Sequence, residues 1–179
     1  MRFSERIDRD SIASPNFTPN EMSLQRFIDA QDGGASHDPS GTAYEVALKE
    51  IRNGAKIGHW IWFIFPQGPF GESARSQRYA INSSDEARAY LEHEVLRERL
   101  MQITKAVAER LEEGALPKVL MESSIDCQKL SSSMTLFHSV AVAIGDDYVS
   151  TITQRVLGQL EVHGWPPCIR TLEWLSNTQ

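Results

Sequence analysis

Apolar residues recur at helical spacing along most of the chain. In residues 20–31 they return every three or four positions, which predicts a helix capped by Asn20. The same spacing predicts a second helix over residues 42–53, and Gly54 suits its end because glycine accepts a left-handed backbone. Residues 32–41, between the two, are rich in Gly, Ser and Asp and are predicted to form a loop.

The second half of the chain continues in this way. Residues 83–86 read Ser-Ser-Asp-Glu, a capping box in which Ser83 accepts from the third helical amide and Glu86 reaches back. Helical stripes then cover residues 94–113, a segment from Asp146 or Asp147 to Gly164, and residues 169–175. Alternating strand patterns and fixed-period repeats are absent from the sequence. We therefore expect an all-α fold: a compact, single-domain, irregular helical bundle over residues 20–179.

The N-terminal residues 1–19 mix charges, Ser and Pro without periodicity and are predicted to form a flexible leader. They lack the apolar stretch of a secretory signal, and the longest apolar run, residues 57–65, is too short to span a bilayer. The two cysteines, Cys127 and Cys168, show neither CxxC nor Cys/His spacing. We therefore expect a cytoplasmic protein with reduced thiols and no membrane contact.

Charge and motifs narrow the range of functions. The 179 residues carry a net charge of -6, which disfavours a nucleic-acid partner because a phosphate backbone repels an acidic surface. The five histidines are scattered without metal-ligand spacing, so no metal site is predicted. Nucleotide-binding glycine motifs and the common hydrolase motifs are absent, and no cofactor is predicted.

An aromatic cluster with polar ends, HWIWFIFPQ, spans residues 59–67. It contains two of the four tryptophans, Trp60 and Trp62. Aromatic clusters are most often core, but indole faces also stack on nucleobases or sugars, and His59 and Gln67 offer directed hydrogen bonds. We expect the cluster to be core on its Trp62 and Phe65 side and pocket wall on its His59 and Gln67 side.

Two further groups of residues suggest an anion site. Asp126 and Lys129 precede a Ser-Ser-Ser run that includes Ser132 and Ser133. Read structurally, the run starts a helix that Asp126 or a serine caps. Read functionally, free amides at a helix start, hydroxyls and a lysine suit a phosphate or carboxylate.

The second group lies in residues 71–79. Ser73 and Tyr79 flank Arg75 and Arg78 there, and two arginines beside a glycine turn can clamp an anion. The alternative is that both arginines are surface residues paired with nearby acids. The candidate ligand-binding residues are therefore His59, Trp60, Gln67, Ser73, Tyr79, Asp126, Lys129, Ser132 and Ser133.

Four segments in order resemble an uncharacterised bacterial family, domain of unknown function 1810, some members of which are labelled calpastatin. They are LQRFIDAQ, YEVALKEIRNGAKIGHWIWFIFPQ, GESARSQRYAINSSDEARAYLEHEVLRERL and DCQKLSSSMTLF, within residues 24–137. This chain has Gly58, Ile61 and Ser131 where the family pattern has serine, methionine and arginine. The resemblance implies a helical single domain and no settled activity. It adds Gln31, Tyr44, Trp62, Phe65, Pro66 and Thr135 to the positions of interest.

Two functional hypotheses remain open. The first is a domain that binds a small nucleotide-like or anionic ligand, with Asp126 or His59 as the acid–base candidate if it is hydrolytic. It predicts that His59, Gln67, Asp126 and Lys129 converge on one cleft. The second is a non-catalytic protein–protein interaction domain, which predicts an exposed apolar patch instead. The sequence gives neither the ligand nor the oligomeric state.

Overall fold

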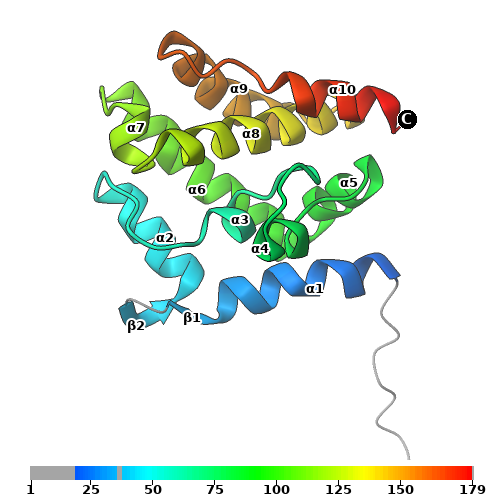
Figure 1. Ribbon diagram of the computed structural model, residues 1–179, viewed down its shortest axis with the longest axis horizontal. Coiled ribbons are helices and arrows are strands. Elements are labelled where there is room, and N and C mark those ends of the chain that lie inside the picture. The colour runs from blue at the N-terminus through cyan, green and yellow to red at the C-terminus, as the bar shows by residue number, and fades with distance from the viewer. Residues whose placement is uncertain (1–18, 36–37, 179) are drawn as a thin grey trace, which may run out of the picture.

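This computed structural model describes residues 19–35 and 38–178 of the chain. These residues contain ten helices and one short strand pair (Figure 1). The first five helices are α1 (Pro19–Asp32), α2 (Ala43–Arg52), α3 (Ile61–Ile64), α4 (Ala74–Arg78) and α5 (Ser84–Glu92). The others are α6 (Glu94–Glu112), α7 (Pro117–Leu120), α8 (Ser124–Ile144), α9 (Asp147–Val162) and α10 (Ile169–Asn177). The predicted all-α fold is confirmed. The predicted leader lies outside the described residues, apart from Pro19.

Near the N-terminus the structure corrects two boundaries. Helix α1 begins at Pro19, one residue before the predicted cap Asn20, and proline is well accommodated in a first helical turn because it lacks only an amide that is unpaired there. The predicted loop over residues 32–41 contains two short strands, β1 (Gly34–Ala35) and β2 (Asp38–Thr42), which pair antiparallel. A pairing this short leaves no alternating pattern to detect in the sequence.

Helix caps follow the sequence at most junctions. Thr42 and Glu45 form a complete capping box at the start of α2, and Gly54 follows its end with φ of +92°. Ser83 caps α5 as predicted, but the Glu86 carboxylate does not bond back to Ser83. It accepts instead from the Asn82 amide at 2.8 Å and pairs with Arg26 of α1 at 2.7 Å. Glu86 therefore joins two helices.

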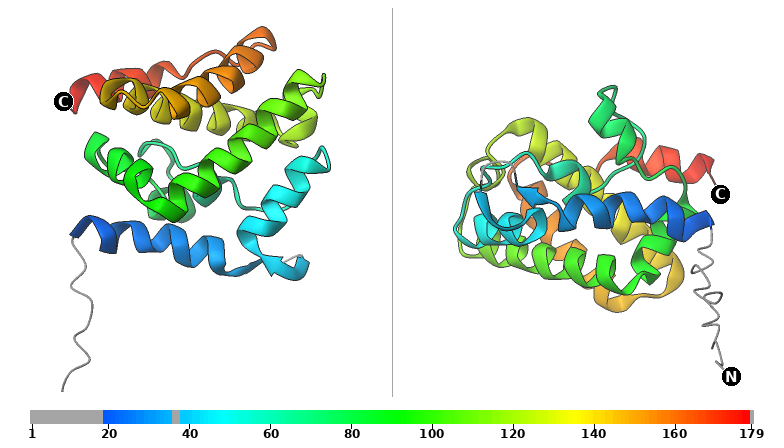
Figure 2. Two further views of the ribbon diagram at one scale, coloured as in Figure 1. Left: turned by 180° about the vertical axis from the view of Figure 1, so that it is seen from behind. Right: turned by 90° about the horizontal axis from the view of Figure 1, so that it is seen from below.

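The helices stack in layers (Figures 1 and 2). Helices α1 and α2 lie on one side, α5 and α6 in the middle, and α8, α9 and α10 on the other side. Helix α8 packs against α3, α5, α7, α9 and α10, and its residues 130–137 are all buried. Burial on every face explains why α8 reads as a nearly continuous run of small and apolar residues.

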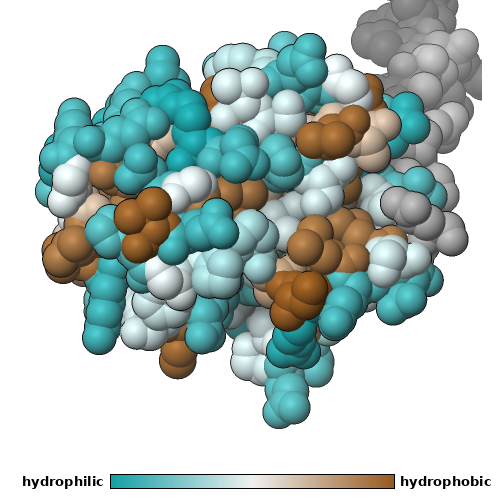
Figure 3. Space-filling view, turned by 90° about the horizontal axis from the view of Figure 1, so that it is seen from above, coloured by the Kyte–Doolittle hydropathy of each residue, from teal (hydrophilic) through white to brown (hydrophobic). Residues whose placement is uncertain are grey.

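The surface is polar over most of the face seen in Figure 3, where apolar side chains form small, separate patches. Exposed apolar residues include Ile57, Val119, Val162 and Ile169. Within the described residues, no helix is both long enough and apolar enough to cross a membrane.

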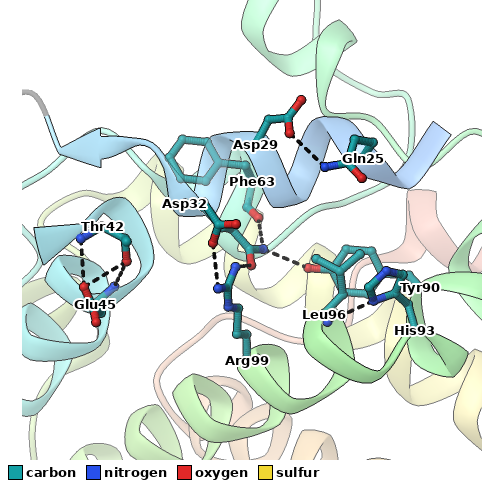
Figure 4. Close-up of polar contacts among 11 residues, drawn as sticks. Gln25, Asp29, Asp32, Thr42, Glu45, Phe63, Tyr90, His93, Leu96 and Arg99 are labelled. Carbon is teal, nitrogen blue, oxygen red and sulfur yellow. Dashed lines mark hydrogen bonds and ion pairs between the residues drawn. The ribbon is translucent and has the colours of Figure 1, made fainter. Parts of the chain in front are cut away.

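The short helix α3 is held by a buried glutamine. Gln31 of α1 is 1% exposed, and its side-chain amide donates to the Phe63 carbonyl at 2.9 Å and to the Tyr90 hydroxyl at 3.2 Å. Arg99 of α6 donates to the Gln31 carbonyl oxygen at 3.3 Å, and Figure 4 shows Phe63, Tyr90 and Arg99 converging. A buried amide with all these partners fixes α3 against α1, α5 and α6.

Candidate functional site

One groove gathers several of the predicted residues. It lies between the loop after α3, the start of α4, the first half of α8 and the start of α10, and its volume is about 550 Å³. Gln67, Ser73, Lys129 and Ser132 line it. Sites for small molecules usually have volumes of about 300–1,000 Å³, so this groove is large enough for a mononucleotide-sized ligand.

The rim of the groove is a tight loop, residues 65–73, that glycines make possible. A Cβ on Gly68 would lie 2.7 Å from the Phe70 ring, and a Cβ on Gly71 would lie 2.3 Å from Ser76 Oγ. The Gln67 carbonyl accepts from the Ile81 amide at 2.9 Å, which ties the loop to the core. Ser73 ends the loop and caps α4. The loop is thus held in one conformation from both ends.

Two aromatic rings form the apolar walls of the groove, and each has a cation over it. Lys129 Nζ lies 4.3 Å from the centre of the Trp62 ring, and Arg75 Cζ lies 5.2 Å from the same ring. Arg170 Cζ lies 5.1 Å from the centre of the Phe70 ring, which packs edge-on against Trp174. Such pairs stabilise the cations near the rings and place positive charge along the groove.

The division of the aromatic motif, residues 59–67, between core and groove differs from the predicted one. Trp60 is 2% exposed, and its indole N–H donates to Glu50 Oε2 at 2.7 Å inside the core. Trp62, expected on the core side, is half-buried and lines the groove. His59, expected on the pocket side, is exposed and does not line the groove. Because α3 starts at Ile61, the side chains follow a helical turn that the sequence alone does not fix.

Asp126 lies beside the groove, between two lysines. Its Oδ1 is 3.0 Å from Lys129 Nζ, and its Oδ2 is 2.8 Å from Nζ of Lys56, a residue of the loop after α2. The Lys56 side chain is 2% exposed, whereas that of Lys129 is 20% exposed. A buried ammonium requires such a partner, since desolvation otherwise destabilises the charge. The sequence analysis did not identify Lys56.

The serine run does not form a helix start. Helix α8 begins at Ser124, capped by Ser123, so Ser132 and Ser133 lie in its interior, where backbone amides are used in the helix. The expectation of free amides for an anion is therefore wrong. The Ser132 hydroxyl instead meets Thr171 Oγ1 of α10 at 2.9 Å. The Ser133 hydroxyl is buried without a hydrogen-bond partner among the described residues.

Tyr79 and Cys127 are buried and do not line the groove. Tyr79 is 9% exposed and packs against the rings of Phe27 and Phe63, away from the groove lining. Cys127 is fully buried, and burial, followed by the nearby Asp126 carboxylate, raises the pKa of its thiol to about 11. Residues 19–35 and 38–178 contain no group of three His, Cys, Asp or Glu residues placed to hold a metal ion.

Sequence reasoning missed four residues that shape the site: Glu50, Lys56, Phe70 and Arg170. Each stands alone in the sequence and reaches its partner only through the fold. For Lys56 and Phe70, the one available signal was the position of a charge or a ring beside the aromatic motif.

Comparisons with known proteins agree with the fold and assign no activity. The family model described as "Protein of unknown function (DUF1810)" matches residues 21–161. The crystal structure of the conserved hypothetical protein Rv1873 from Mycobacterium tuberculosis is similar, with 33% sequence identity and a TM-score of 0.69. The similarity covers 86% of this chain and 96% of that one. No curated protein matches the chain.

Proposed function

We propose that this chain, which belongs to the DUF1810 family of proteins of unknown function, binds a small molecule in the groove between α4, α8 and α10. The ligand combines a flat ring with an anionic group, as a nucleotide does. The observation that carries the proposal is the position of Lys129, whose ammonium lies 4.3 Å from the Trp62 ring while both residues line the groove.

The chemistry of the lining supports this ligand class. Trp62 and Phe70 offer apolar faces on which a ring can stack, and Gln67 offers a side-chain amide at the same groove. The Ser73 and Ser132 hydroxyls also line it, and they already bond to Ser76 and Thr171. Lys129 and Arg170 place two cations in the lining, against one acid, Glu72. This local excess of positive charge contrasts with the net charge of -6 of the whole chain. An anion is attracted to the groove and repelled by the rest of the surface.

The position of Arg75 indicates how the ring of a ligand would reach Trp62. Both Lys129 and Arg75 lie close to the Trp62 ring, so a ligand that stacks on a ring face covered by one of these cations replaces that cation. Lys129 is held by Asp126, whereas Arg75 is exposed on the five-residue helix α4. Displacing Arg75 therefore costs less, and its guanidinium is then available to the anionic group.

The proposal is limited to binding. Both oxygens of Asp126 contact lysine ammonium groups, and Asp126 does not line the groove. The other predicted acid–base candidate, His59, is outside the lining as well. A general base needs a free oxygen or nitrogen within hydrogen-bond reach of the ligand, so we assign no hydrolytic step to these residues.

A protein–protein interaction domain is the second candidate. A different cavity of about 430 Å³ between α5, α8 and α10 favours it, because Val140, Ile144, Leu172 and Leu175 give that cavity an apolar lining. On the face seen in Figure 3, the apolar side chains form small, separate patches and no single broad one.

A thermal-shift panel tests the ligand proposal. The panel contains AMP, NAD, ADP-ribose, flavin mononucleotide and inorganic phosphate, with adenosine as the uncharged comparison. A ligand at 100 times its Kd adds about 2.7 kcal/mol, which shifts the melting temperature by several degrees. We expect an anionic ring compound to stabilise the parent and Lys105→Met, a control outside the groove, but not Lys129→Met. No shift with any compound, or equal shifts in both variants, would overturn the proposal for this panel.

A further inference from the structure

The geometry assigns to Lys56 the role of a positioning residue that sets the charge of the groove. Its buried ammonium occupies one oxygen of Asp126, so Lys129, on the other oxygen, presents a surplus positive charge to an anionic ligand. The assignment rests on the proposed binding function and deepens it, because it names the residue that makes the groove selective for anions.

Lys56 is fixed in place by its backbone and by its side chain. Its backbone amide donates to the Leu120 carbonyl at 2.9 Å, which ties the loop after α2 to α7. Its side chain is 2% exposed, and its Nζ lies 2.8 Å from Asp126 Oδ2 and 5.4 Å from the centre of the Trp60 ring. A lysine at this position cannot turn to solvent, so its charge acts where it is buried.

The charges around Asp126 do not cancel. One carboxylate, Asp126, faces two ammonium groups, those of Lys56 and Lys129. Glu122 is also near Lys56, at 3.6 Å, but its side chain is 58% exposed and its charge is largely screened by water. Asp126, Lys56 and Lys129 together therefore carry one positive charge in excess, while the buried Glu50 carboxylate is bonded to the Ile57 and Gly58 amides and to the Trp60 indole.

The excess positive charge reaches the groove through Lys129. Of the three residues, only Lys129 lines the groove. Without Lys56, Asp126 and Lys129 would form a neutral pair, and a neutral pair attracts an anion weakly. With Lys56 in place, the Asp126 charge is shared, and the Lys129 ammonium is only partly neutralised on the side that faces the groove.

A charge series tests the assignment. Lys56→Met removes the excess positive charge, and Asp126→Asn doubles it. The double variant has the same excess charge as the parent. We expect affinity for AMP to fall roughly threefold to tenfold in the first, to rise by a similar factor in the second, and to return near the parent in the third, as one unit charge across a partly solvated site should give. Adenosine affinity should stay constant. If Lys56 serves stability alone, all three variants will weaken AMP and adenosine alike, and the assignment is wrong.

A second readout needs no bound ligand. This readout is the quenching of tryptophan fluorescence. Trp62 lines the groove, and its contribution is the part of the fluorescence that is lost in Trp62→Phe. Iodide, an anion, and acrylamide, a neutral molecule, both quench exposed indoles. The ratio of iodide to acrylamide quenching should fall in Lys56→Met, rise in Asp126→Asn and return in the double variant.

The two readouts separate the two proposals. If quenching follows the charge series while AMP does not bind, the role of Lys56 stands and the proposed function fails for that ligand. If quenching is the same in all variants with parent-like circular dichroism, the role of Lys56 is overturned, whatever binds in the groove. Glu122→Gln is the matched control, because it alters an exposed acid near Lys56 and should leave both readouts near the parent.

Discussion

Lys129 Nζ lies 4.3 Å from the centre of the Trp62 ring, and this contact joins α8 to α3 at the wall of the groove. The Lys129 ammonium is paired with Asp126, and the loop that follows α3 is tied to the core by the hydrogen bond from the Ile81 amide to the Gln67 carbonyl. A cation and an aromatic face are thus fixed side by side before any ligand arrives. Binding therefore requires little further ordering of the protein at this point.

Exchanging each tryptophan of the motif should separate core from groove. Trp60→Leu removes a 2%-exposed ring and leaves the Glu50 carboxylate short of a donor, so we expect the free energy of unfolding to fall by about 3 kcal/mol or more. Trp62→Leu should change it by less than about 1 kcal/mol, yet weaken a ring ligand about tenfold, because a stacking surface is lost. Urea denaturation and calorimetric titration measure the two effects. The reverse pattern would mean that Trp60 is the ligand wall.

Glu50 should be essential for the loop that leads into the aromatic motif. Its Oε2 accepts from the amides of Ile57 and Gly58 at 2.7 and 3.0 Å and from the Trp60 indole at 2.7 Å. Glu50→Ala leaves these donors without that acceptor, and we expect a loss of about 2–4 kcal/mol of unfolding free energy. Glu50→Gln retains one carbonyl acceptor and should lose less. Equal losses in urea denaturation would show that the hydrogen bonds are not what matters.

The helices could be predicted from the sequence more fully than the groove. The helical stripes, the cap at Ser83 and a start of α9 at Asp146 or Asp147 could be predicted because they depend on neighbours in the chain. The groove could be predicted only in part. Lys129 and Gln67 stand in conspicuous motifs, but Lys56 and Arg170 become relevant only when the packing of α8 brings distant segments together.

The serine run shows a second limit to what can be predicted from the sequence. Small polar residues are typical of helix starts, and Ser123 is indeed the cap of α8. The three serines at 131–133 lie deeper in the same helix, where Ser131 donates to the Pro166 carbonyl and Ser132 bonds to Thr171 of α10. Composition does not separate the two situations, because both call for the same residue types.

Stability should depend on pH through Asp146. Its hydrogen bond and ion pair with Arg97 are the main cause that lowers the carboxyl pKa below the ordinary value of 3.8. A pKa lowered in the folded state stabilises the protein above the unfolded-state value, and this contribution is lost as pH falls through the folded-state pKa.

Asp146→Asn isolates that contribution, because asparagine still caps α9 without a charge. We expect the variant to be less stable than the parent at about pH 6 and the difference to shrink by about pH 3, as followed by the urea midpoint. A difference that does not change with pH would assign the effect to the cap geometry alone.

The two cysteines should react at very different rates. Cys127 is fully buried and its thiol pKa is raised to about 11, so little thiolate forms at neutral pH, whereas Cys168 is half-buried at the groove. Ellman's reagent should label one thiol in the folded protein and two in urea. Cys168→Ser should leave the folded protein unlabelled. Rapid labelling of that variant would mean that the region around Cys127 opens readily.

The most direct test of the groove is a nuclear magnetic resonance titration of the tryptophan indole N–H signals with AMP. Trp62→Phe identifies one signal, and Trp60→Phe identifies a second as the internal control. We expect AMP to move the Trp62 signal, adenosine to move it only at higher concentration, and the buried Trp60 signal to stay in place. If AMP moves other signals and leaves Trp62 unchanged, the ligand binds elsewhere and the proposed groove is wrong.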